Sequence, residues 1–310
     1  MKPGIKDLLW MAAGALVLLI CMLGVFHFQE DQNPAAQLAM RARRVDLVGR
    51  MQLDLASASE AEKSAVLAIT DQDSQALADQ ARAASARVEK ERHELAGLLA
   101  VGGTQGEREL SAQFATAFAE FQRVDDELLT LAVKNTNVKA YALTFGPVAT
   151  AVKEMNAALD RLVAANTDSP TATKVTLFAL AAETSSLRLQ TLLPPHIAEE
   201  DDKKMDALEA VMATEDAQVR KSLDGLAALP NLGKDPELTN AVTRYAEFSR
   251  LKTQVLALSR ENTNVRSLSI SLNEKRRVML VCQDALDALH KAILAEPIAG
   301  TTYGPPAKPR

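Results

Sequence analysis

Apolar residues recur every three or four positions along most of the chain. The clearest stripe begins at Phe114 and is followed by a second that begins at Val152: Phe114, Ala117, Phe121, Val124, Leu128 and Leu131, then Val152, Met155, Leu159 and Leu162. This spacing places apolar side chains on one face of a helix, where they can pack against partner helices. No proline occurs between Pro34 and Pro147, which also favours helices joined by short turns. The pattern predicts an all-α protein.

Turn signals divide these stripes into eight expected helices. Asn33-Pro34 predicts a helix start, with Asn as the N-cap and Pro at the first helical position. Asp71 or Asp73 is placed to cap the second helix, and Gly102-Gly103 to end it. We therefore expect a first four-helix bundle over residues 34–166 and a second over residues 169–294.

Short motifs occur twice in the middle of the chain, always 127 positions apart. Phe118-Ala-Glu-Phe-Gln-Arg123 returns as Tyr245-Ala-Glu-Phe-Ser-Arg250, and Asn135-Thr-Asn-Val138 returns as Asn262-Thr-Asn-Val265. A register held without a gap indicates two copies of one structural unit. Short turns make sequential helices neighbours, so each copy is expected to form its own up-down-up-down bundle. The boundary is expected at Asn166-Thr-Asp-Ser-Pro170, a helix end followed by a Ser cap and a Pro.

The repeated Asn-Thr-Asn motif falls where the third helix of each copy must turn into the fourth. Its first Asn can adopt the left-handed conformation that closes a helix, and the Thr or second Asn can cap the next one. We interpret these residues as structural turns of two hairpins; a ligand site made from their amides is the alternative. The residues are Asn135, Thr136 and Asn137, with their repeats Asn262, Thr263 and Asn264.

The composition excludes several classes of function but does not indicate a specific one. The net charge is −5 and no basic patch with interleaved aromatics occurs, so nucleic acid is not an expected partner. The sequence has no Gly-rich phosphate loop, nucleophile motif or metal-ligand spacing, so we expect no enzyme, no cofactor and no metal site. Cys282 falls on the apolar stripe of a helix and is expected to be a small core residue.

One segment is apolar enough to be a membrane span. A run of 19 residues from Leu8 carries no charge and would rise roughly 28 Å as a helix. Lys2 and Lys6 precede it, and no small-x-small cleavage site follows. We expect an uncleaved transmembrane helix over residues 8–28; the alternative is a signal peptide cleaved near Ala35–Ala36.

The expected topology follows from these charges. Basic residues before the span favour a cytoplasmic N-terminus over residues 1–7, with the bulk of the chain in the periplasm of a bacterial inner-membrane protein. A competing interpretation keeps the helical part in the cytoplasm. The polar, Pro-rich residues 295–310 are expected to form a disordered tail.

The first helix carries the candidate ligand residues. Three polar residues, Gln52, Ser59 and Glu62, interrupt its apolar stripe and could line a small pocket between helices. Arg43 and Arg44 could bind an anionic ligand or lipid headgroups. The alternative is structural: polar residues at the edge of the stripe reach water, and exposed arginines bind nothing specific.

These features resemble the four-helix-bundle sensor domain of methyl-accepting chemotaxis proteins. The resemblance rests on Glu60-Ala-Glu-Lys-Ser-Ala-Val-Leu67, Leu128-Leu-Thr-Leu-Ala-Val-Lys-Asn135 and Leu258-Ser-Arg-Glu-Asn-Thr-Asn-Val265, and covers about residues 29–293 in two copies. It implies sensing outside the cytoplasm, often of a small organic ligand bound between helices or at a dimer interface. The chain departs from these receptors because it shows no second transmembrane run, no linker module and no cytoplasmic signalling hairpin.

The expected function is therefore a membrane-anchored sensory, ligand-binding or adaptor module that relies on a membrane receptor or kinase partner for its output. The two copies could pair within one chain as a pseudo-dimer. The alternative is a periplasmic spacer or scaffold with no small-molecule ligand.

Overall fold

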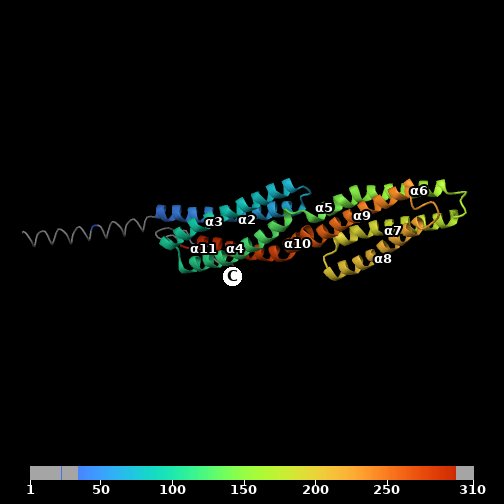
Figure 1. Ribbon diagram of the computed structural model, residues 1–310. Coiled ribbons are helices and arrows are strands. Elements are labelled where there is room, and N and C mark those ends of the chain that lie inside the picture. Colours follow the sequence, from blue (N-terminus) through green and yellow to red (C-terminus); the bar gives the residue numbers. More distant parts are fainter. Residues whose placement is uncertain (1–21, 23–33, 298–310) are drawn as a thin grey trace, which may run out of the picture. The chain divides into compact units, whose positions relative to one another are not determined.

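The computed structural model describes Met22 and residues 34–297, and every regular element in this part of the chain is helical. It divides into two compact units (Figure 1). The first unit contains residues 34–61, 79–123 and 275–297 of the described chain, and the second contains residues 62–78 and 124–274. The all-α prediction is confirmed.

The first unit packs four helical segments around one core. They come from α2 (Pro34–Leu67), α3 (Asp71–Gly102), α4 (Gln105–Ala132) and α11 (Arg276–Ala295). The core combines buried residues of all four helices: Leu47, Val48, Met51, Leu55 and Ala58; Ala84, Val88, Leu95 and Leu99; Phe114, Phe118 and Phe121; and Cys282, Leu286, Leu289 and Ile293. Phe114 stacks on Phe118, which stacks on Phe121, so three rings fill the centre of the α4 face.

The second unit is built mainly from α6 (Ala149–Ala165), α7 (Ala172–Ala198), α8 (Asp202–Ala227) and α9 (Pro236–Glu261). Its core includes Val152, Met155 and Leu159 of α6 with Phe248 of α9. Short helices α5 (Thr136–Leu143) and α10 (Thr263–Ile270) complete it. Side chains of Asp201 and Asp235 accept hydrogen bonds from backbone N–H groups at the starts of α8 and α9, which fixes these two helix ends.

The fourth helix of each sequence copy packs in the other unit. In the first copy this helix is α6, whose core residues pack with α7, α8 and α9. In the second copy it is α11, whose core residues pack with α2, α3 and α4. The two four-helix groups are therefore not the consecutive segments 34–166 and 169–294 that the repeat predicts. The fourth helices of the two copies carry apolar residues at the same repeat positions. Each of these helices can therefore bury its apolar face in the other unit as well as in a hairpin with its own copy.

The 127-residue register recurs in the backbone. The short helices α5 and α10 begin at Thr136 and Thr263. Each is followed by one π-helical turn, η1 (Thr144–Val148) and η2 (Ser271–Lys275), before the long helix resumes. A π turn inserts one residue into a helix and is a specific local feature, so its repetition at the same register supports a shared origin for both segments.

The described part of the chain contains no helix long and apolar enough to cross a membrane. The prediction of a transmembrane signal anchor, and of a single-pass inner-membrane location that depends on it, is therefore wrong on this finding. The predicted span, residues 8–28, lies outside the described residues apart from Met22, and most of the predicted tail lies beyond residue 297.

Candidate functional site

The repeated Asn-Thr-Asn motifs lie against each other within the second unit. We call the six residues 135–137 and 262–264 the clasp. Asn135 and Asn262 both adopt the left-handed conformation, with φ of 51° and 53°. Asn tolerates this conformation better than most residues because its short polar side chain can bond locally. Asn262 ends α9 and starts α10, whereas Asn135 starts α5 three residues after α4 ends.

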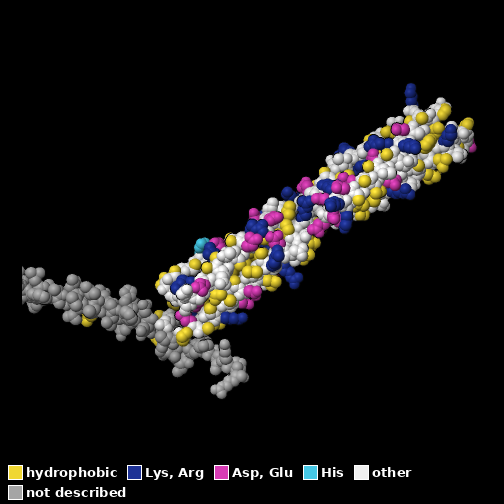
Figure 2. Space-filling view, turned by 90° about the horizontal axis from the view of Figure 1, so that it is seen from below, with side chains coloured by type: hydrophobic (Ala, Val, Ile, Leu, Met, Phe, Trp, Pro, Cys, Tyr) yellow, Lys and Arg dark blue, Asp and Glu magenta, His cyan; other side chains and the backbone are white. Residues whose placement is uncertain are grey.

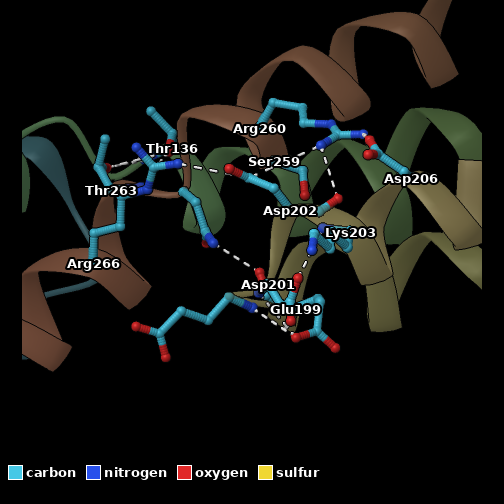
Figure 3. A network of polar contacts seen from close by, with 12 residues as sticks. Thr136, Glu199, Asp201, Asp202, Lys203, Asp206, Ser259, Arg260, Thr263 and Arg266 are labelled. Carbon is cyan, nitrogen blue, oxygen red and sulfur yellow. Dashed lines mark hydrogen bonds and ion pairs between the residues drawn. The ribbon is translucent and has the colours of Figure 1, made fainter.

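Hydrogen bonds across the clasp are reciprocal (Figure 3). The N–H of Thr136 donates to Oγ1 of Thr263 at 3.2 Å, and the N–H of Thr263 donates to Oγ1 of Thr136 at 3.1 Å. The N–H of Asn137 donates to Oδ1 of Asn264 at 3.2 Å, and the N–H of Asn264 returns the bond to Oδ1 of Asn137 at 3.1 Å. These side chains satisfy N–H groups that the helix starts would otherwise leave unpaired.

Side-chain amides extend the clasp into its surroundings. Nδ2 of Asn137 donates to Oδ1 of Asn262 at 2.7 Å, and Nδ2 of Asn264 donates to Oδ1 of Asn135 at 3.0 Å. Nδ2 of Asn262 also donates to the carbonyl of Glu199 at 2.7 Å. The clasp residues except Asn264 are almost fully buried, whereas Asn264 and Glu199 are partly exposed. The clasp is therefore a satisfied polar network, and its amides are used within the chain.

The clasp residues do not close the predicted hairpins. The stripe before the first motif, at Phe114 and Phe121, belongs to the core of the first unit. The stripe after it, at Met155 and Leu159, belongs to the core of the second. A hairpin would place both stripes in one core. The motifs instead join two segments of each sequence copy whose core residues belong to different units. The motifs themselves bind each other within the second unit.

A surface groove lies beside the clasp in the second unit. Its cavity volume is about 520 Å³, and it is lined by the end of α4, by α10 and by the α7–α8 connection: Glu127, Thr130, Leu131, Glu200, Arg266, Ser269 and Ile270. We call it the α4–α10 groove. It combines one guanidinium, two carboxylates and two hydroxyls with an apolar wall. This is an arrangement that can orient a small polar molecule.

A network of charges borders this groove. Arg266 reaches Oδ1 of Asp202 only at 3.9 Å, a separation too long for a hydrogen bond. Arg260 instead forms a close ion pair with Asp206 (Figure 3). Its Nε also donates to Glu209 at 2.8 Å. The hydrogen bond from Arg260 is the main cause that lowers the pKa of Glu209. Arg266 is therefore held less closely than Arg260 by the carboxylates of α8.

The internal repeat provides a comparison for this groove. The position related to Arg266 is Lys139, which forms a 2.8 Å ion pair with Asp71. The positions related to the hydroxyl residues Thr130 and Ser269 are both alanines, and Gln254 stands where the groove has Glu127. The two copies share an identical Asn-Thr-Asn-Val motif and differ in the side chains beside it. The two hydroxyls and the carboxylate of Glu127 are thus specific to one side of the clasp.

A buried histidine lies close to the clasp. His196 is fully buried, and its Nδ1 lies 2.8 Å from Oγ of Ser259 while its Nε2 lies 2.9 Å from Oε1 of Glu209. Oγ of Ser259 also donates to the carbonyl of His196 at 3.0 Å. This chain of polar contacts joins α7, α8 and α9 and fixes the end of α7 next to the groove.

The predicted ligand residues of helix α2 do not come together in one site. Arg43 is exposed and pairs with Glu94 at 2.7 Å, and Gln52 donates to Asp287 at 2.7 Å. Ser59 is buried within the first unit, whereas Glu62 is buried within the second. None of the five lines the α4–α10 groove.

Arg44 has a structural role that explains its burial. Thr104 and Glu107 form a capping box at the start of α4, in which the N–H of Thr104 donates to Glu107 at 2.9 Å and the N–H of Glu107 donates to Thr104 at 3.2 Å. Arg44 pairs with the same carboxylate at 3.3 Å and donates to the carbonyl of Gly102. The guanidinium therefore locks the α3–α4 turn.

The groove residues were missed because their sequence signal is weak. Glu127, Thr130, Arg266 and Ser269 are ordinary polar residues on amphipathic helices, whose exposed faces are expected to be polar. A signal was present only in the repeat: these positions differ between copies that keep the clasp unchanged. Figure 2 shows acidic and basic side chains interspersed on the visible face, so charge clustering does not reveal the groove.

Metal and thiol chemistry receive no support from the described residues. No group of three or more His, Cys, Asp or Glu side chains in this part of the chain could hold a metal ion. Cys282 is fully buried in the first core, and burial raises its pKa to about 12. Its thiol is therefore protonated near neutral pH and behaves as a small core side chain.

Comparison with known proteins connects this architecture to signalling. Residues 44–174 match the four helix bundle sensory module for signal transduction. The match covers less than half of the chain and supports a relationship to chemoreceptor-type sensory modules. It includes α6, so the matched segment contributes helices to both compact units. The chain has no significant match among curated proteins.

A partly buried carboxyl on α7 gives the second unit a pH-dependent stability. Burial, and then the charge of Asp160, raises the pKa of Glu183 to about 7. The folded chain therefore binds this proton more tightly than the unfolded chain, and stability falls as pH rises from about 4.5 to 7. We expect Glu183→Gln to stabilise the second unit by about 1–2 kcal/mol at pH 8, after allowance for solvent screening.

Thermal unfolding of Glu183→Gln at pH 8 and pH 4.5 measures this effect. The gain should nearly vanish at pH 4.5, where Glu183 is protonated in the folded chain and about half protonated in the unfolded chain. Glu215→Gln, on the neighbouring helix, is the matched control. A gain of equal size at both pH values would show that ionisation of Glu183 has no part in it.

Proposed function

We propose that the chain is a sensory module that binds a small organic molecule in the α4–α10 groove. The observation that carries the proposal is the position of this groove directly beside the clasp, with Arg266 at its edge held only by a long contact of 3.9 Å to Asp202. The match of residues 44–174 to a sensory module supports the same class of function. A spacer without a ligand would have no need of the two hydroxyls of this lining, which are alanines at the repeat-related positions.

The groove chemistry favours a small zwitterion. Arg266 offers a guanidinium to a carboxylate, and the hydroxyls of Thr130 and Ser269 can donate to it. Glu127 and Glu200 offer acceptors to an ammonium group. Leu131 and Ile270 provide an apolar wall. A molecule that carries one carboxylate, one ammonium and a short aliphatic part fits this set.

The clasp can couple the binding of such a ligand to the rest of the module. Groove residues come from α4, before the first clasp motif, and from α10, which begins within the second. A ligand that bridges these helices favours one separation between them, and the reciprocal bonds of the clasp couple that separation to both motifs. Output would pass to a receptor or kinase partner. The two sequence copies, bound through the clasp, would act as an intramolecular pseudo-dimer.

The ligand prediction is tested by thermal unfolding of the full chain with α-amino acids and ω-amino acids at millimolar concentration. A ligand present at 100 times its Kd stabilises the folded state by about 2.7 kcal/mol, which shifts the unfolding midpoint upward. We expect Arg266→Met to abolish the shift because the carboxylate loses its partner.

Lys139→Met is the matched control for this experiment, since it changes the repeat-related position away from the groove. It should keep the ligand shift of the natural chain. If no zwitterion in the set moves the midpoint, or if both variants respond alike, the groove is not the binding site and the scaffold interpretation gains support.

A further inference from the structure

A second groove lies between α6 and α7, both of which belong to the second unit. Its cavity volume is about 450 Å³, and its lining is mixed: Ala149, Val152, Lys153, Asn156, Ala157 and Asp160 from α6, with Leu187 and Gln190 from α7. We call the surface around it the α6–α7 face. It does not include the α4–α10 groove, and the proposed sensory function does not use it.

Two leucines on this face are about half exposed. Leu180 and Leu187 are 53% and 47% exposed. Seven residues separate them, close to two helical turns, so both project from the same side of α7. Two leucines stacked in this way form a seam that another helix could cover.

Two charges on α6 lack partners within the described part of the chain. Neither Lys153 nor Asp160 forms an ion pair there, although both are exposed. They are also seven residues apart, about 10 Å along the helix, so they are too distant to pair with each other. Their midpoint falls between Asn156 and Ala157.

An unpaired polar atom marks the same midpoint. Oδ1 of Asn156 is buried and has no hydrogen-bond partner. A buried acceptor without a donor costs about 1–3 kcal/mol, so such atoms usually indicate a missing neighbour or water. The clasp shows how this protein satisfies the same group elsewhere, because Asn137 and Asn262 bond amide to amide at 2.7 Å.

We infer that the α6–α7 face binds a second copy of the same chain in an antiparallel, two-fold arrangement. A two-fold axis that crosses α6 between Asn156 and Ala157 brings Lys153 of one copy to Asp160 of the other, twice. It also brings the two Asn156 amides together. The same operation centred on α7 between Glu183 and Thr184 pairs Leu180 with Leu187.

The two centres coincide, which is what makes the face self-complementary. In the α6–α7 hairpin, Ala149 and Gln190 line the groove at one end, and Asp160 lies toward the other. Along two antiparallel helices, residues at the same height have numbers that add up to a nearly constant value. Ala149 and Gln190 add up to 339, so residues 156–157 of α6 lie at about the same height as residues 183–184 of α7. One axis therefore satisfies the charges, the amides and the leucines together. An unrelated helix would have no reason to match this symmetry.

The expected contact is small. A face two helices wide and about five turns long falls below the roughly 800 Å² per partner of standard stable interfaces, so association should be weak and reversible. Charge pairs at such a rim set orientation more than affinity. Their reversal is therefore a sensitive test of the arrangement.

Sedimentation equilibrium of the full chain from 5 to 500 µM tests the inference. We expect a monomer–dimer equilibrium that Lys153→Asp and Asp160→Lys each weaken at least tenfold. The double variant Lys153→Asp/Asp160→Lys should restore it, because the two charges meet across the axis. Lys234→Asp, in the α8–α9 connection, is the matched control and should leave the equilibrium unchanged.

Leu180→Arg provides an independent check on the apolar seam and should give a monomer with unchanged helix content, because Leu180 contributes half of its surface to solvent. A natural chain that stays monomeric at 500 µM overturns the inference. So does a dimer that persists in Leu180→Arg, or a double variant that fails to recover association.

Discussion

A cut between Thr167 and Asp168 is expected to leave the two halves of the chain bound to each other. Both residues are exposed in the connection from α6 to α7, so a protease sequence inserted there should be accessible. The first half then carries α2 to α6, and the second carries α7 to α11. In the first unit, α11 from the second half packs with α2, α3 and α4 from the first half. In the second unit, α6 from the first half packs with α7, α8 and α9 from the second half.

The free energy that resists separation comes from both exchanged helices. Cys282, Leu286, Leu289 and Ile293 of α11 are fully buried against residues of the first half. Five α6-side residues are buried against the second half: Val148, Val152, Met155, Leu159 and Leu162. Burial of each large apolar side chain contributes about 1.5–3 kcal/mol, so separation exposes surface worth on the order of 10 kcal/mol.

Size-exclusion chromatography with light scattering measures the result. The nicked chain should elute with the mass of the intact chain, and denaturant should separate the halves. Each half expressed alone is the control and should be partly unfolded or self-associated, because its exposed stripe has no partner. If each half is instead a monomer with a cooperative unfolding transition, the fourth helices fold back on their own copy and the exchange is refuted.

The helices and their ends follow from local sequence, and the structure agrees with the prediction that the chain is helical. Asn135 and Asn262 show why: the left-handed conformation is a property of the residue and its neighbours, independent of what lies across the core. The choice of partner is different. Met155 and Cys282 occupy the same repeat position and are both fully buried. Met155 of the first copy lies in the core of the second unit, and Cys282 of the second copy lies in the core of the first unit. Periodicity predicts that they are buried but cannot say against which helices.

The candidate site was less predictable for a related reason. Arg44 looked available on a helix stripe, but the capping box of α4 uses it, and that box is 60 residues away in sequence. Arg266 looked like any surface arginine. Its importance arises from a neighbour at 3.9 Å where the related Lys139 has one at 2.8 Å. Such differences of about 1 Å depend on the packing of three segments and leave no pattern in the sequence.

Loss of the clasp hydroxyls is expected to destabilise the second unit strongly. Thr136→Val removes the acceptor for the N–H of Thr263, and Thr263→Val removes the acceptor for the N–H of Thr136. Each variant leaves one buried donor unpaired, which costs about 1–3 kcal/mol. Valine keeps the shape of threonine, so the packing around the clasp should change little.

The double variant Thr136→Val/Thr263→Val should lose about 2–5 kcal/mol in total. The sum of the two single losses should exceed the double loss, because the two hydroxyls also bond each other at 3.2 Å and either substitution already breaks that bond. Thermal midpoints of the four chains in this cycle measure the coupling. Thr136→Ser and Thr263→Ser keep both acceptors and are the matched controls, with small expected losses.

The comparison of the two single variants carries the most information. The clasp is reciprocal in its bonds, with backbone contacts of 3.2 and 3.1 Å, so the two losses should be equal within about 0.5 kcal/mol. Equal losses with clear coupling mean that the two motifs act as one element, which is what the transmission of a ligand's effect from the groove to both sequence copies requires. If one variant is neutral while the other is severe, the symmetry is only geometric, and a ligand beside Arg266 would influence one motif alone.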